Sequence, residues 1–232
     1  SIIYCSITGF GQNGPLALLP GYDFVIQAMA GIMSITGEKD GPPIKPGVAY
    51  ADIFTSLYSV IAIQAALHSR KKTGIGSFID MSLYDTQLAV LANQASTYLL
   101  NGKEPKRMGN KHPSIVPYQL FEAKDGDIII ACGNDQQFKS LCNAFEWDFA
   151  NSKKFSTNKK RIKNRTELIS ELSNKLKKFK KEKIIKILNK AKVPVGNVNS
   201  IGEALNHVQT KSRKMIKSIS GEKFVRTPIL YD

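Results

Sequence analysis

The stretch ADIFTSLYSVIAIQAALHSRKKTGIGSFIDMS, residues 51–82, decides the fold. Apolar residues dominate from about Ala51 to His68, which predicts a long helix. Lys71–Gly76 supplies basic residues for the last turn and glycines just beyond it, the usual end of a helix. Ser77–Met81 then has the pattern of a short strand. A long helix that leads directly into a strand predicts an α/β fold.

The neighbouring residues extend this alternation. Ile2–Thr8 is typical of a short buried strand, and Tyr22–Ile32 has helical periodicity. Leu83–Leu100 predicts a second long helix. The glycine-rich loop Gly9–Pro15 follows a strand, as a dinucleotide-binding loop does, but Pro15 disrupts the expected helix start. We therefore reject a dinucleotide-binding fingerprint here.

The polar loop Gly102–Pro117, with three prolines, indicates a domain boundary. Beyond it, Lys124-Asp125-Gly126 joins two strand-like segments into a hairpin, and helical patterns follow. The predicted elements are strands at Tyr118–Ala123 and Asp127–Cys132, helices at Asp135–Phe145, Glu167–Lys178 and Lys181–Lys192, a strand-like exit at Val193–Val198, and a short helix at Ile201–His207. We expect three segments: 1–103, a large α/β domain; 104–198, an inserted smaller α+β domain; and 199–232, a return segment.

Charge is distributed unevenly along the chain, which has a net charge of +14. Residues 1–150 hold 11 Lys and Arg against 13 Asp and Glu, whereas residues 151–232 hold 22 against 6. Apolar residues such as Leu168, Leu172 and Leu176 recur at helical spacing among the lysines, which favours a solvated helix face. A site for anionic ligands or nucleic acid in residues 151–192 is the alternative.

Cysteine and histidine give no metal-binding pattern. Cys5, Cys132 and Cys142 are scattered and flanked mostly by apolar residues, so we expect reduced, largely buried thiols, a cytoplasmic location and no metal. Apolar runs are too short for a membrane span. The first residues have the pattern of an internal strand, so we expect the chain to be part of a longer one.

Asp52 is a candidate nucleophile because it lies between a glycine-containing loop and an apolar helix. Free N–H groups and the positive end of the helix dipole favour an ionised carboxylate there. From this position alone, an ordinary helix cap is the better explanation. Of the three histidines, His68, His112 and His207, only His112 lies in a polar loop where it can face a ligand.

The chain resembles the class III CoA-transferases along its length. The motifs that carry the resemblance, in order, are Ile3–Gln12, Gly21-Tyr22-Asp23, Ser34–Gly37, Gly47–Asp52, Lys72–Gly76, Ile79–Leu83, Ser114–Gln119, Gly133–Phe138 and Val193–Gly196. The branch most similar in appearance contains dicarboxylate transferases such as succinate–hydroxymethylglutarate CoA-transferase. The ensemble of motifs is specific, although each motif alone is not.

The resemblance implies a Rossmann-like large domain, an inserted small domain and an interlocked homodimer. It implies that Asp52 is the nucleophile, which attacks an acyl-CoA thioester and carries first the acyl group and then CoA. The tyrosine at the position of Tyr22 contacts the acceptor carboxylate, the residue at Leu83 lines the CoA channel, and we place His112 in the substrate site. CoA thioesters are substrates, and we expect no tightly bound cofactor.

Two alternatives remain at this point. The same family includes α-methylacyl-CoA racemases, in which a histidine replaces Tyr22 and works with the aspartate as acid and base. A tyrosine, with an unperturbed pKa of about 10, is a poor base near neutral pH, so transfer is favoured over racemisation. The nucleic-acid-binding alternative lacks any reader motif in residues 151–192. We therefore expect acyl-CoA and small carboxylates as partners, and neither nucleic acid nor membrane. The resemblance also implies missing segments at both ends, and the isolated fragment is then expected to be inactive.

Overall fold

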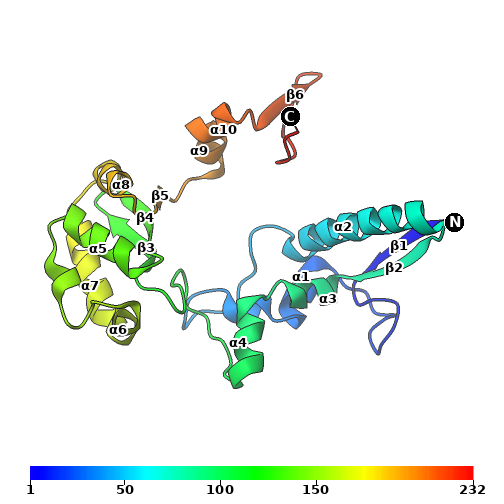
Figure 1. Ribbon diagram of the computed structural model, residues 1–232, viewed down its shortest axis with the longest axis horizontal. Coiled ribbons are helices and arrows are strands. Elements are labelled where there is room, and N and C mark those ends of the chain that lie inside the picture. The colour runs from blue at the N-terminus through cyan, green and yellow to red at the C-terminus, as the bar shows by residue number, and fades with distance from the viewer. Residues whose placement is uncertain (232) are drawn as a thin grey trace. The chain divides into compact units, whose positions relative to one another are not determined.

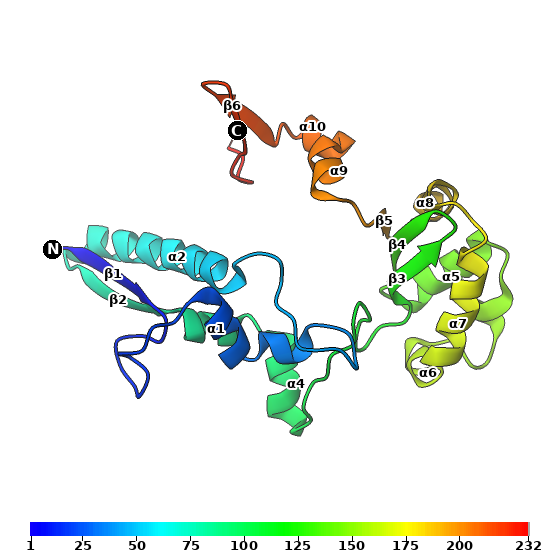
Figure 2. The same cartoon turned by 180° about the vertical axis from the view of Figure 1, so that it is seen from behind.

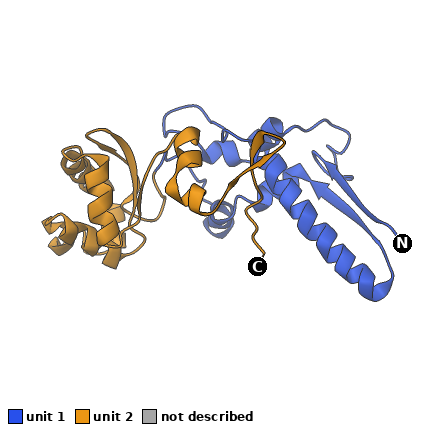
Figure 3. Ribbon diagram, turned by 90° about the horizontal axis from the view of Figure 1, so that it is seen from above, with its two compact units in different colours: residues 1–110 blue, residues 111–232 orange. Residues whose placement is uncertain are grey.

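The chain forms two compact units, residues 1–110 and 111–232, shown in blue and orange in Figure 3. The computed structural model describes residues 1–231. Both units contain helices and small sheets, which confirms the mixed α/β class. The predicted three-part division and the Rossmann-like architecture of the first part stay predictions.

The first unit is built on a two-stranded parallel sheet. Strands β1 and β2 pair in register from Ile3 opposite Ser77 to Thr8 opposite Ser82, and helix α2 lies along them (Figures 1 and 2). The elements of this unit are β1 (Ile3–Thr8), α1 (Asp23–Met29), the 3-10 helix η1 (Ile32–Ile35), α2 (Tyr50–Thr73), β2 (Ser77–Ser82), α3 (Leu83–Ala89) and α4 (Asn93–Asn101).

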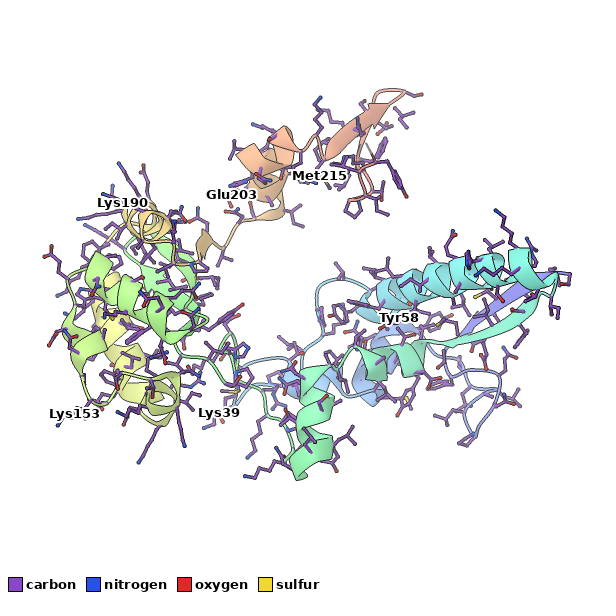
Figure 4. The ribbon with its side chains drawn as sticks, in the orientation of Figure 1. Lys39, Tyr58, Lys153, Lys190, Glu203 and Met215 are labelled. Carbon is purple, nitrogen blue, oxygen red and sulfur yellow. The ribbon has the colours of Figure 1, made fainter. Side chains whose placement is uncertain are left out.

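Helix α2 confirms the prediction made from residues 51–82. It ends at Gly74, whose φ of 74° lies in the left-handed region and whose N–H donates to the Arg70 carbonyl at 2.8 Å. Much of its apolar surface is exposed, as at Leu57 (55%) and Ile61 (63%), and Figure 4 shows its side chains projecting, Tyr58 among them. Within residues 1–231, α2 alone is long and apolar enough to cross a membrane, which corrects the expectation that every apolar run is too short. Helices of soluble proteins pass the same test of length and composition.

Two helix predictions in the first unit were wrong in extent. The single helix expected over residues 83–100 is two helices, because the chain breaks at Val90–Ala92 and Ala92 adopts a φ of 48°. The helix expected to reach Ile32 ends at Met29, because Gly31 takes a φ of 90° and redirects the chain into η1. Neither break follows from hydrophobic periodicity.

The core of the first unit is small. Ile26, Ala30, Ala51 and Leu83 form its buried apolar cluster, with Phe10 and Tyr84 packed against it. This cluster joins α1, α2 and α3, and it therefore fixes the position of the first turn of α2 relative to α1.

The second unit contains an antiparallel sheet in the order β3-β4-β5. The hairpin predicted around Lys124-Asp125-Gly126 is confirmed, and the strand-like exit after Val193 pairs with β4. The elements are β3 (Tyr118–Ala123), β4 (Gly126–Ala131), α5 (Asp135–Ala144), η2 (Asp148–Asn151), α6 (Asn158–Lys163), α7 (Arg165–Leu176), α8 (Lys181–Lys190), β5 (Val195–Asn197), α9 (Ile201–Asn206), α10 (Val208–Ser212), β6 (Ile216–Ile219) and β7 (Glu222–Val225).

The core of the second unit is larger and follows the predicted spacing. On α7, Leu168, Leu172 and Leu176 are each at most 1% exposed, so one helix stripe is buried against the sheet. Burial of each such side chain contributes roughly 1.5–3 kcal/mol. Exposed lysines lie on the outer surface, among them Lys190 at the end of α8 and Lys153 in the turn before α6, both of which project in Figure 4. This arrangement agrees with a solvated helix face.

Arg161 is a buried cation that sequence analysis did not identify. Its side chain is 0% exposed and its Nε donates to the Val116 carbonyl at 2.6 Å. Nη1 donates to the Phe155 carbonyl at 3.0 Å, and Nη2 donates to Asp135 Oδ1 at 2.7 Å. The guanidinium also lies over the Phe138 ring. One side chain thus ties together the loop before β3, the loop before α6 and the start of α5.

The last elements of the chain contribute nothing to this core. Among residues 199–231, none is buried, and β6 and β7 form a separate antiparallel hairpin. Cys132 and Cys142 are buried in the second unit and Cys5 is half-buried in the first, which confirms the expected burial of the thiols. Their reduced state stays a prediction.

Candidate functional site

Asp52 is the third residue of α2 and its side chain is exposed. The helix begins at Tyr50, and Ala49 is the residue at the capping position, with no side-chain cap of its own. Asp52 therefore does not cap the helix, which corrects one interpretation of the sequence. No hydrogen bond to the Asp52 carboxylate comes from the part of the chain that the structure describes.

Asp23, from α1, caps α2 instead. Its Oδ1 accepts from the backbone N–H of Ala51 at 2.8 Å and from that of Asp52 at 3.4 Å. Its Oδ2 accepts from Nε2 of Gln27 at 2.7 Å. The free donors that we expected to stabilise Asp52 are therefore directed at the neighbouring carboxylate.

The electrostatics of Asp52 also differ from the expectation. Partial burial raises the pKa of the Asp52 carboxyl above its usual value, and the negative charge of Asp23 raises it further. The sequence argument predicted the opposite direction, from free N–H groups and the helix dipole. It failed because it did not include a second carboxylate at the same helix end.

Tyr22 lies beside this pair of carboxylates in the chain. It immediately precedes Asp23, it occupies the capping position of α1, and its side chain is 80% exposed. Because Asp23 contacts the first turn of α2, the backbone of Tyr22 is brought into the neighbourhood of Asp52. The structure therefore places Tyr22 next in the chain to the carboxylate that contacts the first turn of α2, and a shared site with Asp52 stays a prediction.

Close backbone packing positions Tyr22 and Asp23. A Cβ on Gly9 would lie 2.7 Å from Cα of Gly21, and one on Gly21 would lie 2.8 Å from Cα of Gly9. Only residues without side chains allow this approach. Glycine occupies positions 9, 11 and 14, which fits G-x-G-x-x-G, but the next helix begins only at Asp23. The first of these glycines thus serves to seat the segment before α1.

Leu83 lies in the core of the first unit. Its side chain is 8% exposed and belongs to the apolar cluster with Ala51. The next residue, Tyr84, donates its N–H to the Gly9 carbonyl at 3.0 Å. A contact between Leu83 and CoA stays a prediction.

His112 belongs to the second unit. Its Nδ1 accepts from the Ser114 N–H at 3.1 Å, and its ring packs on Tyr118 with centroids 5.0 Å apart. Arg165 donates to the carbonyls of His112 and Pro113 at 2.9 and 3.1 Å. Burial lowers the pKa of His112, and the charge of Arg165 lowers it further, so the neutral ring is favoured. Its role toward substrate stays a prediction.

Other features do not join this site. Over residues 1–231, no group of three or more His, Cys, Asp or Glu side chains is placed to hold a metal ion. A mostly apolar cavity of about 610 Å³ lies beside η1, α3 and α4, lined by Leu88, Leu91 and Tyr98 among others. Asp52 is not part of that lining, so the cavity is separate from the site.

Sequence analysis missed Asp23 and Gln27 as members of the site. Asp23 was part of the quoted Gly21-Tyr22-Asp23 motif, but no role was assigned to it. Its position 29 residues before Asp52 carries no local signal, because the contact joins two separate helices. Alanine at position 49, where a capping residue is expected, was the available clue.

Curated relatives share the sequence of this chain over nearly its whole length. The chain is 46% identical to succinate–glutarate CoA-transferase of Agrobacterium fabrum, in a match that covers 99% of the chain and 59% of that protein. It is 44% identical to human succinyl-CoA:glutarate CoA-transferase, over 86% of the chain and 46% of that protein. The chain thus spans about half to three fifths of the length of these relatives.

Solved structures share its fold. A crystal structure of a CAIB/BAIF family protein from Brucella suis is 50% identical, with a TM-score of 0.86 over 99% of this chain and 61% of that one. A protein from M. tuberculosis, 22% identical with a TM-score of 0.88 over 99% of this chain and 61% of that one, shares the fold. The sequence model of CoA-transferase family III matches residues 1–231. The chain therefore belongs to CoA-transferase family III.

Proposed function

We propose that the whole protein transfers CoA from an acyl-CoA to a small dicarboxylic acid, with Asp52 as the covalent carrier. The observation that carries the proposal is the exposed Asp52 carboxylate, which receives no hydrogen bond from residues 1–231 although it lies in the first turn of a helix. The names of the relatives, succinate–glutarate CoA-transferase among them, support dicarboxylates as the substrate class.

The first half of the reaction transfers CoA to the enzyme. One oxygen of Asp52 attacks the thioester carbonyl, the C–S bond breaks, and a mixed anhydride and CoA thiolate form. The thiolate then attacks the Asp52 carbonyl of the anhydride, and the donor acid leaves as its carboxylate. Asp52 now carries CoA as a thioester, and no redox step or external proton is required.

The second half reverses these steps with the acceptor. The acceptor carboxylate attacks the Asp52 thioester, which releases CoA thiolate and forms a new anhydride. Attack of the thiolate on the acceptor carbonyl gives the new acyl-CoA and regenerates the Asp52 carboxylate. In this proposal the Tyr22 hydroxyl contacts the acceptor carboxylate, Leu83 and His112 contribute to the binding of CoA and substrate, and the protein is a cytoplasmic homodimer.

The test is to trap the intermediate on the whole protein. The protein is incubated with succinyl-CoA and quenched with hydroxylamine, and the modified peptide is mapped by mass spectrometry. We expect a hydroxamate at Asp52 in the wild type and in Asp85→Asn, a control at an exposed carboxylate in the first turn of α3. We expect none in Asp52→Ala.

Glutarate labelled with ¹³C, added as acceptor, then tests transfer itself. Labelled glutaryl-CoA is the expected product, and its formation is lost in Asp52→Ala. The absence of an adduct with succinyl-, glutaryl- and acetyl-CoA, together with exchange of an α-proton of a branched acyl-CoA into deuterated water, contradicts the proposal and favours racemisation.

A further inference from the structure

The cap on α2 comes from outside the helix. In an ordinary helix, the side chain at the capping position accepts from the N–H groups of the second and third helical residues. Here those residues are Ala51 and Asp52, and Ala49 at the capping position has no side-chain oxygen that could accept from them. Oδ1 of Asp23 takes both bonds, at 2.8 and 3.4 Å.

The place of Asp52 in the helix makes this cap chemically important. An acidic residue at the third helical position is the one that folds back onto the backbone N–H of the capping residue in a capping box. Such a bond stabilises a helix start, but it would occupy the oxygen that attacks the thioester. With Asp23 supplying the cap, the first turn of α2 is held without the Asp52 side chain.

Gln27 fixes the capping carboxylate. Its side chain is 0% exposed, and its Nε2 donates to Oδ2 of Asp23 at 2.7 Å, one turn along the same helix. Each oxygen of Asp23 thus has its own donor: Oδ2 accepts from the buried side-chain amide of Gln27, and Oδ1 accepts from the backbone of α2. Because Ile26 and Ala51 pack in the same apolar cluster, apolar contacts also hold the two helices together.

We propose that Asp23 is a positioning residue for CoA transfer: it caps α2 from α1 and so keeps the Asp52 carboxylate unbonded and directed for attack. The inference rests on the proposed function. Of the described residues, Asp23 is also the one whose charge acts on Asp52, and it makes the Asp52 carboxylate more basic.

Two variants separate the cap from the charge. Asp23→Asn keeps one oxygen, which accepts from the Ala51 N–H as a good cap does, and it removes the negative charge. Its new amide NH2 faces Gln27, whose side-chain amide can turn to accept through Oε1, a buried atom without a partner among residues 1–231. Asp23→Ala removes both. Asp85→Asn, at the exposed start of α3, is the matched control for loss of a carboxylate in the same unit.

The experiment measures, on the whole protein, the single-turnover rate of adduct formation on Asp52 with succinyl-CoA as a function of pH. We expect Asp23→Ala to react about 100-fold more slowly, the cost of a nucleophile displaced by about an ångström. We expect Asp23→Asn to keep a rate within about tenfold of the wild type. The acid limb of its pH–rate profile should shift to lower pH, because the negative charge of Asp23, which helps to raise the pKa of Asp52, is gone. Asp85→Asn should match the wild type in the rate of adduct formation and in the position of the acid limb.

Hydrogen exchange at the Ala51 amide supplies a readout that is independent of activity. Protection should be retained in Asp23→Asn and lost in Asp23→Ala, and it reports the cap even where the alanine variant melts at a lower temperature. A wild-type rate in Asp23→Ala, or equal rates in the two variants with an unshifted acid limb, overturns the inference. The absence of any adduct in the wild type instead removes the proposed function.

Discussion

Replacement of Arg161 with methionine should destabilise the second unit far more than loss of any surface cation. The change keeps an apolar stem in the core but removes the donors to two carbonyls, those of Val116 and Phe155. Each buried carbonyl left without a donor costs about 1–3 kcal/mol. Asp135, the third partner, is 53% exposed, so water replaces its lost bond at little cost. We therefore expect a loss of about 3 kcal/mol.

Urea unfolding of the 232-residue chain measures this loss. Trp147 is the single tryptophan of the chain and stacks on Phe145 in the second unit, so its fluorescence reports the unfolding of that unit. With a slope of about 1–3 kcal/mol per molar urea, the midpoint should fall by roughly 1–3 M.

Lys154→Met is the matched control. Lys154 pairs with Glu167 at 2.7 Å, but the two side chains are 59% and 48% exposed, and such surface pairs contribute about 0–1 kcal/mol. A loss below about 1 kcal/mol in Arg161→Met, or one no larger than that of the control, refutes the reasoning. It would mean that water or other donors reach both carbonyls.

Two further predictions concern the thiols and the helix break. Burial raises the pKa of Cys132 to about 12 and that of Cys142 to about 11, so iodoacetamide at pH 8 should label Cys5 alone in the folded chain and all three after unfolding, as mass spectrometry would show. Because both folded-state values exceed the unfolded value of about 8.5, their contribution to stability should fall as pH rises from 8.5 through 11; labelling of Cys132 under native conditions contradicts this. Ala92→Gly should raise the stability of the first unit by roughly 1 kcal/mol, because a φ of 48° strains alanine; a lower melting temperature by circular dichroism, the ordinary effect of glycine, would contradict the strain argument.

The elements that sequence predicted well are those whose signal is local. The stripe of leucines on α7 and the Lys124-Asp125-Gly126 turn each carry their own pattern, and the structure has both. The end of α2 at Gly74 could also be predicted, because helices commonly end at a residue in the left-handed conformation and glycine adopts it most easily.

The features that sequence could not predict depend on contacts between distant segments. The break between α3 and α4 falls at Val90–Ala92, where neither glycine nor proline interrupts the apolar pattern. Arg161 lies within the sequence NKKRIK, where it has the appearance of one more solvated cation. The cap that Asp23 places on α2 could not be predicted, because it forms only when α1 and α2 pack together.

The contact between Gly9 and Gly21 gives two distant positions of the sequence the same constraint, because neither can carry a side chain. A methyl group at either position forces the backbone of the other to retreat, and the segment that retreats is the one that carries Tyr22 and Asp23 to α2. Neither position can compensate for a side chain at the other by becoming smaller, because both are already glycine. In a mutational scan that measures turnover, substitutions at both glycines should be as damaging as those at the reacting residues, although neither glycine has a side chain that could contact a substrate.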